Sequence, residues 1–216
     1  GTPSGISLAP EGGAHQSIGT PLIGISQPGL LSYEPAFADE LSAIMSYGFN
    51  YLQDDNGGSV YLRLSTRSID QPLRNLDKNL TNYILKGGYW LKKPGPNPEI
   101  IIVYQGVMAN EVIKATGYLG ERFKDVGVLS ITSSDNLFNE WKKKTISFNL
   151  ETSKSHIEHL LEFVPRDTKI ITVIDGHPMT LSWLGSVCGH KTLPLGVDRF
   201  GQTGNINDLF EEFAID

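Results

Sequence analysis

The residues of this chain best suited to chemistry lie in a short glycine-rich loop near its amino terminus. Glu11, His15 and Gln16 bring a carboxylate, an imidazole and an amide into one small space. The intervening Gly12 and Gly13 give the backbone the freedom to approach a ligand closely. This set suits general acid–base work, with His15 and Glu11 as candidate catalytic residues and Gln16 as a candidate substrate contact. A turn-stabilising or capping loop explains the same residues equally well.

Two further polar side chains stand where strands are expected to end. His177 lies in the tetrapeptide 175–178, directly after a strand expected over 169–174 and at the edge where open α/β sheets place ligands. Arg67 follows a strand expected over 59–65, where an arginine can hold an anion. Both are candidate substrate contacts. The alternatives are structural: an aspartate that caps the next helix, a histidine that bridges loops, and an exposed arginine.

The elements around the first loop predict one incomplete α/β unit. A short apolar run over 21–25 favours a buried strand, and the segment 32–35 favours the start of a helix whose apolar stripe continues to residue 49. With the strand over 59–65, residues 1–72 form this unit. Residues 73–98 are rich in proline and glycine, which is the composition of a linker between domains.

Residues 99–216 predict a complete domain in which strands alternate with helices. The segment 100–104 is almost entirely apolar, as expected for a parallel strand covered on both faces. Right-handed crossovers then give an α/β, three-layer sandwich with a mainly parallel sheet. Further strands are expected over 126–131, 169–174 and 193–197, with helices over 109–123, 138–145, 156–163, 179–188 and 206–213.

Composition and charge exclude several classes of protein. The 216 residues are 39% hydrophobic and 19% charged, which is typical of a folded globular chain. Eighteen basic against 24 acidic residues give a net charge of −6, which disfavours a nucleic-acid partner. The single cysteine, Cys188, excludes a disulfide scaffold, and no Cys/His cluster has zinc spacing, so we predict no metal site and a cytoplasmic location.

Common motifs of nucleotide sites and hydrolases are missing from this sequence. It contains neither GxGxxG nor a GxxxxGK[ST] phosphate loop, and Ser182 does not stand in Gly-x-Ser-x-Gly. A long apolar segment and the pattern of a signal peptide are also missing. The polar glycine-rich start without methionine leads us to expect a piece excised from a longer protein.

The order of these segments resembles the thiamine-diphosphate-dependent transketolase superfamily. Residues 11–16 resemble its acidic Gly-Pro-Thr-His-Gln loop, and residues 65–67 resemble its Ser-Thr-Arg loop. The segments 32–37 and 85–89 are similar to Ser-Tyr-Asp-Pro-Ala-Tyr and Lys-Gly-x-Tyr of the homodimeric pyruvate dehydrogenase decarboxylase component, and residues 198–204 resemble the Phe-Gly element before the last helix. The extra loop histidines of the pyruvate dehydrogenase pattern are not reproduced.

The resemblance implies the tail of a pyrimidine-binding domain followed by a transketolase-type C-terminal domain. It implies a parent that uses thiamine diphosphate and Mg²⁺ to decarboxylate pyruvate oxidatively and passes the two-carbon unit to lipoamide. Its implied partners are a second copy, as a homodimer, and a lipoyl-bearing acyltransferase. The loop histidine matching His15 and the acid matching Glu11 would contact the substrate.

Two alternatives stay open. The first is a transketolase that moves ketol units between sugar phosphates. The second is a non-catalytic dimerisation or docking module, because the metal motif that holds the cofactor's diphosphate is not found in this sequence. We therefore expect the isolated chain to bind no cofactor and to be inactive.

Overall fold

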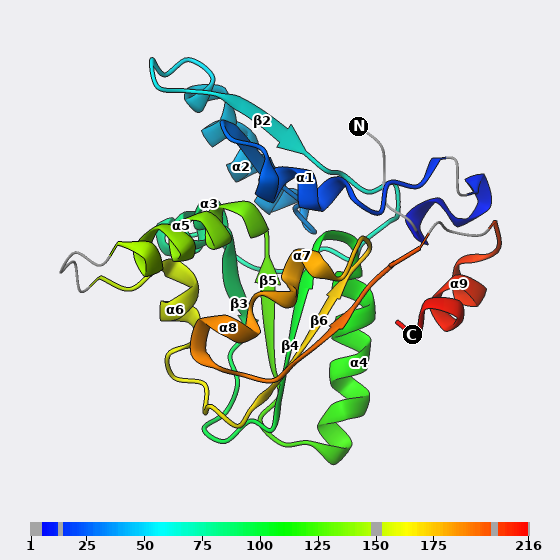
Figure 1. The fold of residues 1–216 in the computed structure, drawn as a ribbon. Helices are drawn as coiled ribbons and strands as arrows, with labels where there is room; N and C mark the ends of the chain where they lie inside the picture. The colour runs from blue at the N-terminus through cyan, green and yellow to red at the C-terminus, as the bar shows by residue number, and fades with distance from the viewer. Residues whose placement is uncertain (1–5, 13–14, 148–152, 200–202, 216) are drawn as a thin grey trace.

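The computed structural model describes residues 6–12, 15–147, 153–199 and 203–215. These residues form a small amino-terminal α/β unit and a larger carboxyl-terminal one (Figure 1). In the small unit, strands β1 (Leu30–Tyr33) and β2 (Ser59–Leu62) pair in parallel, and helix α2 (Ala38–Tyr51) connects them. The 3-10 helix η1 (Ile6–Glu11) and helix α1 (Thr20–Ser26) precede β1.

The larger unit is built on a five-stranded sheet in the order β3-β5-β4-β6-β7. Strand β3 runs antiparallel to β5, and the other pairs are parallel. Its strands are β3 (Gly88–Lys92), β4 (Ile100–Gln105), β5 (Gly127–Ile131), β6 (Lys169–Ile174) and β7 (Thr192–Leu195). Its helices are η3 (Gly106–Met108), α4 (Ala109–Arg122), α5 (Ser134–Ile146), α6 (His156–Leu161), α7 (Met179–Ser182), α8 (Gly185–Cys188) and α9 (Ile206–Phe213). Helix α3 (Lys78–Lys86) leads into β3.

Helices cover both faces of the larger sheet, which confirms the three-layer sandwich. All six residues of β4 are buried, and their side chains alternate between two cores. Ile102 and Tyr104 pack in one core with α4, α9 and η1. Ile101 and Val103 pack in the other with α5, α6, α7 and α8. The continuous apolar run over 100–104 is therefore explained by burial on both sides.

Two expectations for the small unit are wrong. Residues 21–25 belong to helix α1 and not to a strand, because Pro21 occupies its first turn, where proline favours a helix. The segment around 32–35 is not a helix start, since β1 ends at Tyr33. Pro35 disfavours helical backbone at the preceding residue, and the Glu40 carboxylate accepts the amide hydrogens of Ala36 and Phe37 just before α2.

The segment 73–98, predicted to be a linker, contains helix α3 and strand β3. Strand β3 pairs with β5 and therefore belongs to the larger sheet. The Tyr89 hydroxyl of β3 donates to the Glu40 carboxylate of α2 at 2.6 Å, so this segment also contacts the small unit. The division into 1–72, 73–98 and 99–216 stays a prediction.

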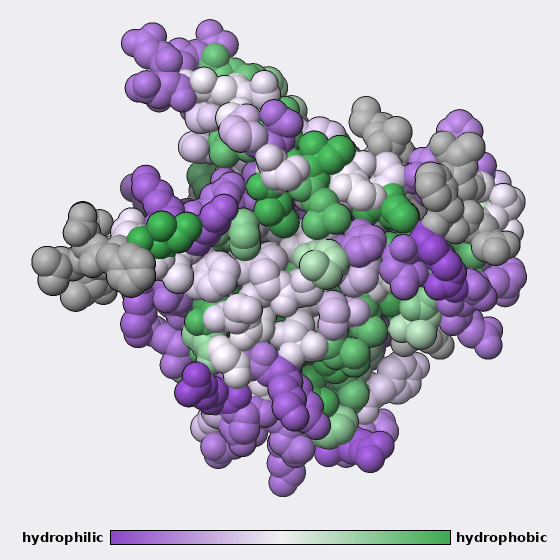
Figure 2. Space-filling view, viewed as in Figure 1, coloured by the Kyte–Doolittle hydropathy of each residue, from purple (hydrophilic) through white to green (hydrophobic). Residues whose placement is uncertain are grey.

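In the surface view, apolar side chains gather over α1 on the face shown (Figure 2), and Ile23 of this helix is 53% exposed. Among the helices of the described ranges, none has both the length and the apolar character that a membrane span requires.

Candidate functional site

Four polar residues stand at the carboxyl ends of parallel strands and meet between the two units. Glu34 follows β1, Arg63 follows β2, Gln105 ends β4 and Asp175 follows β6. Arg63 Nη1 lies 2.6 Å from Glu34 Oε1, and Gln105 Nε2 donates to Glu34 Oε2 at 2.9 Å. Arg63 Nη2 donates to the Asp175 carbonyl oxygen at 2.7 Å. We call these four residues the strand-end cluster.

The strand-end cluster is a buried joint between the two units. Each of its residues is at most 5% exposed. Burial raises the pKa of the Glu34 carboxyl, and the Arg63 guanidinium and the Gln105 amide oppose that shift. Gly106, with φ +61°, leaves the space for Glu34, since a Cβ there would lie 2.5 Å from Glu34 Oε1. The Glu34 carboxylate and the Arg63 guanidinium therefore neutralise each other, while Arg63 Nε and Gln105 Oε1 have no hydrogen-bond partner among the described residues.

The Asp175 carboxylate holds the amino-terminal segment of the chain. Its Oδ1 accepts the Ile6 amide hydrogen at 2.7 Å, and its Oδ2 accepts from the Ser7 amide at 3.0 Å and from the Ser7 hydroxyl at 2.9 Å. In helix α7, which follows, the N-cap residue is Pro178, and no hydrogen bond between the Asp175 carboxylate and this helix is present among the described residues. The alternative that this aspartate caps the next helix is therefore wrong, because its acceptor sites serve a segment far away in the sequence.

The loop that contains the predicted catalytic residues begins at this segment. Glu11 and His15 are exposed, and Gln16 is buried. Gly12 has φ +84°, a backbone conformation that favours glycine. Gly13 lies outside the described residues. The His15 amide donates to the Gly12 carbonyl at 3.2 Å. The roles assigned to His15, Glu11 and Gln16 stay predictions.

His177 lies beside the end of the same loop. Its backbone amide donates to the Ile18 carbonyl oxygen at 2.8 Å. Its imidazole Nδ1 accepts the amide hydrogen of Met179 at 3.2 Å, and the residue is half-buried. The structure thus brings together His177 and Ile18, which are 159 positions apart in the sequence. A substrate contact through the imidazole stays a prediction.

Arg67 forms an ion pair with Glu111 of helix α4. Its Nη2 lies 2.7 Å from Glu111 Oε1 on α4, and its guanidinium carbon lies 5.4 Å from the centre of the Phe210 ring on α9. The pair lines an apolar groove of about 570 Å³ between α4, α9 and the sheet. Glu111 was not singled out from the sequence, because a carboxylate in the first turn of a helix is ordinary there.

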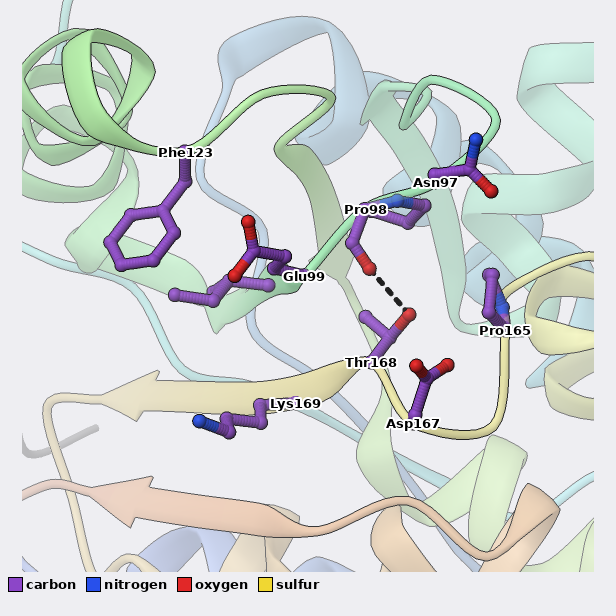
Figure 3. A pocket seen from close by; sticks show the side chains of 9 residues that line it. Asn97, Pro98, Glu99, Phe123, Pro165, Asp167, Thr168 and Lys169 are labelled. Carbon is purple, nitrogen blue, oxygen red and sulfur yellow. Dashed lines mark hydrogen bonds between the residues drawn. The ribbon is translucent and has the colours of Figure 1, made fainter.

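A separate hollow of about 390 Å³ lies at the opposite edge of the larger sheet (Figure 3). Glu99 and Lys169 stand there at the starts of β4 and β6, and the Thr168 hydroxyl donates to the Pro98 carbonyl at 2.6 Å. Because six-residue strands separate this edge from the strand-end cluster by about 17 Å, the hollow contains none of the predicted site residues.

Sequence reasoning missed Glu34 and Gln105. The available signal was positional, because each polar residue directly follows or ends a short apolar strand, and parallel strands bring such residues to one edge. Glu34 lies in the segment 32–35, which was expected to start a helix, and Gln105 lies between the strand expected over 100–104 and the helix expected over 109–123. Within the described ranges, no three His, Cys, Asp or Glu residues are grouped as a metal site.

The fold and this edge define a class of protein: an α/β domain with a mainly parallel sheet that closes on a partial α/β unit. Residues 87–216 match the family model of the transketolase-like TK C-terminal domain. The match spans more than half of the chain, and the chain belongs to this family.

Curated relatives and solved structures agree with this assignment. The chain is 29% identical to the pyruvate dehydrogenase E1 component of Buchnera aphidicola, over 100% of the chain and 25% of the relative. It is 26% identical to a chloroplastic transketolase of Craterostigma plantagineum, over 99% of the chain and 37% of the relative. A transketolase from Pichia stipitis in complex with xylulose 5-phosphate has a TM-score of 0.66 at 25% identity, over 97% of this chain and 27% of that one. The chain thus spans 25–37% of the length of these relatives.

Proposed function

We propose that the chain is the C-terminal portion of a thiamine-diphosphate-dependent decarboxylase of a 2-oxoacid dehydrogenase complex, with pyruvate as its substrate. The reaction is the oxidative decarboxylation of pyruvate, with transfer of the two-carbon unit to lipoamide. The family match and the similarity to pyruvate dehydrogenase E1 components over the whole chain support the enzyme class.

The observation that favours pyruvate over a sugar phosphate is the ion pair of Arg67 with Glu111. A phosphate dianion is bound best by a cation that is free to meet it. The Arg67 guanidinium is instead neutralised by Glu111 at 2.7 Å and lies over Phe210. Pyruvate carries one carboxylate and no phosphate, so its binding does not require a free Arg67 guanidinium to neutralise a phosphate dianion.

The cofactor is proposed to be held outside this chain. Mg²⁺ with a diphosphate requires free oxygen ligands. In the strand-end cluster, Glu34 is already paired with Arg63 and Gln105, and Asp175 with Ile6 and Ser7. The strand-end cluster therefore does not fit that group, and within the described ranges no three His, Cys, Asp or Glu residues are grouped as a metal site, so we assign these residues no step that passes through it.

The contribution of this chain is proposed to lie in the loop around His15. An imidazole can donate a hydrogen bond to a developing alkoxide and exchange a proton near neutral pH. Glu11 is its nearest acidic partner in the sequence, and Gln16 and His177 are proposed to contact the substrate from the same loop and from the strand end behind it.

The proposed partners are a second copy of the enzyme and a lipoyl-bearing acyltransferase, in the cytoplasm. Several apolar side chains of the small unit and of the segment after it are available for protein contacts. Leu73 is fully exposed, and Phe49 is 61% exposed.

A transketolase is the second candidate, supported by the relatives of that name and by the neighbour solved with xylulose 5-phosphate. The enzyme that contains this chain should reduce an artificial acceptor with pyruvate and should not transfer ketol units from xylulose 5-phosphate. Ketol transfer without pyruvate turnover would select the transketolase. Loss of both would contradict the enzymatic proposal and favour a docking module.

A variant on α4 tests the argument from Arg67 for pyruvate over a sugar phosphate. Glu111→Gln frees the Arg67 guanidinium, so inhibition by inorganic phosphate should strengthen about tenfold, the scale of one charge-assisted contact. Glu121→Gln, an exposed carboxylate on the same helix, serves as the matched control. Equal phosphate inhibition in Glu111→Gln and the unaltered enzyme would remove the argument from Arg67.

A further inference from the structure

The strand-end tripeptide 175–177 holds both ends of the loop that contains His15. We call residues 8–18 the His15 loop; residues 13 and 14 lie outside the described part. Just before the loop, the Asp175 carboxylate accepts three hydrogen bonds, from the amides of Ile6 and Ser7 and from the Ser7 hydroxyl, at 2.7–3.0 Å. Hydrogen bonds to a buried carboxylate are stronger than those between neutral groups.

The end of the loop is attached to the same tripeptide. The His177 amide donates to the Ile18 carbonyl at 2.8 Å. Arg63 Nη2 bridges the Asp175 carbonyl at 2.7 Å and the Ser17 carbonyl at 3.4 Å. A Cβ on Gly176 would lie 3.1 Å from Pro21 Cγ and 3.4 Å from the Ile18 oxygen, so the chain runs close against this glycine.

The larger unit thus fixes where the His15 loop lies. Asp175 is completely buried, so water does not compete for its oxygens. Ile6 and Ala9, on either side of the Ser7 contact, are buried in the core with α9. The loop itself carries exposed Glu11 and His15 between two fixed ends. This is the arrangement expected for a reactive side chain that must be held still on a loop.

We propose that Asp175 is a positioning residue that sets the placement of His15 by anchoring the start of the His15 loop. The proposal rests on the proposed role of His15 in catalysis for its effect on activity, and on geometry alone for its effect on the loop. It assigns to the C-terminal domain a defined task, which is to hold a loop that belongs to the preceding unit.

The first experiment uses the 216-residue chain and measures amide hydrogen exchange. Asp175→Asn keeps the size of the side chain and turns a hydrogen-bond donor toward backbone donors. Exchange at residues 6–12 and 15–18 should become faster by about tenfold or more, while α4 keeps its protection. Asp167→Asn, an exposed carboxylate at the opposite edge of the sheet, is the matched control and should change neither segment.

The second experiment uses the enzyme that contains this chain and a double-mutant cycle. Asp175→Asn should lower kcat/KM by about tenfold or more when His15 is present, and by less than about twofold in a His15→Ala background. A purely structural role would give the same loss in both backgrounds. If the enzyme turns over neither proposed substrate, the proposed function fails, and amide exchange still decides whether Asp175 holds the loop.

A second variant covers the case in which Asp175→Asn does not fold. Gly176→Ala adds one methyl group against Pro21 and the Ile18 carbonyl and leaves every charge in place. It should speed exchange at residues 15–18 and lower kcat/KM only when His15 is present. Unchanged exchange in the His15 loop, or equal activity losses with and without His15, would overturn the proposal.

Discussion

At the scale of single residues, Glu34 and Arg63 form a buried ion pair that is costly to break. Both side chains are nearly inaccessible to water, at 7% and 2% exposed. Removing one partner of a buried ion pair leaves an isolated charge, which costs about 3–5 kcal/mol. Arg63→Met should therefore lower the free energy of unfolding by about that amount at neutral pH.

The loss should depend on pH with a defined sign. Burial already raises the pKa of Glu34, and Arg63 opposes that shift. Without Arg63, the folded state keeps Glu34 protonated to higher pH than the unfolded chain does, so the variant loses stability as pH rises above about 4.3. Urea denaturation from pH 4 to pH 8 measures this. Arg63→Met combined with Glu34→Gln should recover part of the loss, and a pH-independent loss would contradict the argument.

His15 is the second residue with a measurable consequence. In the enzyme that contains this chain, His15→Ala should lower kcat/KM by about 10²-fold or more, the usual scale for a positioned acid–base group. Because the His15 side chain is exposed, the melting temperature of the His15→Ala protein should match that of the unaltered protein. His159→Ala, an exposed histidine on α6, is the control. A His15→Ala enzyme with more than about half of the original rate would remove the acid–base assignment.

At the scale of elements, Gly87 decides how α3 joins the larger sheet. It ends the helix with φ +110°, and its carbonyl accepts the amides of Thr132 and Ser133 at 2.9 and 3.1 Å. A Cβ there would lie 2.5 Å from the Ser133 oxygen. Gly87→Ala should therefore cost about 1–3 kcal/mol through backbone strain alone.

At Gly117, in contrast to Gly87, we expect an alanine to stabilise the chain. It lies inside α4 with nothing within 4 Å of an added Cβ. Gly117→Ala should stabilise the chain by about 0.4–1 kcal/mol, because alanine loses less backbone entropy in a helix. Thermal unfolding of both variants measures the contrast. Equal effects of the two substitutions would show that Gly87 is not constrained by its φ angle.

At the scale of the whole molecule, we expect the chain to lack its own cofactor site. Titration of the 216-residue chain with thiamine diphosphate and Mg²⁺ should give no binding heat at micromolar cofactor. The physical reason is that the carboxylates of the strand-end cluster are already paired with Arg63 or with backbone amides. Glu34→Gln, which removes one of these carboxylates, should leave the titration unchanged. Tight binding by the unaltered chain would contradict the proposal that the cofactor is held elsewhere.

Much of the larger unit was determined by local sequence. The apolar run over 100–104, the strand over 169–174 and the helix over 206–213 were all expected, and each is present. Their patterns suffice because burial on one face leaves a period in the sequence and burial on both faces leaves a continuous apolar run. The small unit was harder. The short apolar run over 21–25 fits a strand or a helix, and Pro21 in the first turn favours the helix that the structure has there.

Only the tertiary structure decided the partners of the buried polar groups. Glu34 meets Arg63 29 positions away and Gln105 71 positions away, and the Asp175 carboxylate meets Ile6 across 169 positions. The sequence shows that such residues stand at strand ends, but it does not show which of them will lie together. Their pairing is decided when two sheet edges close on each other and exclude water, since a buried polar group without a partner costs free energy.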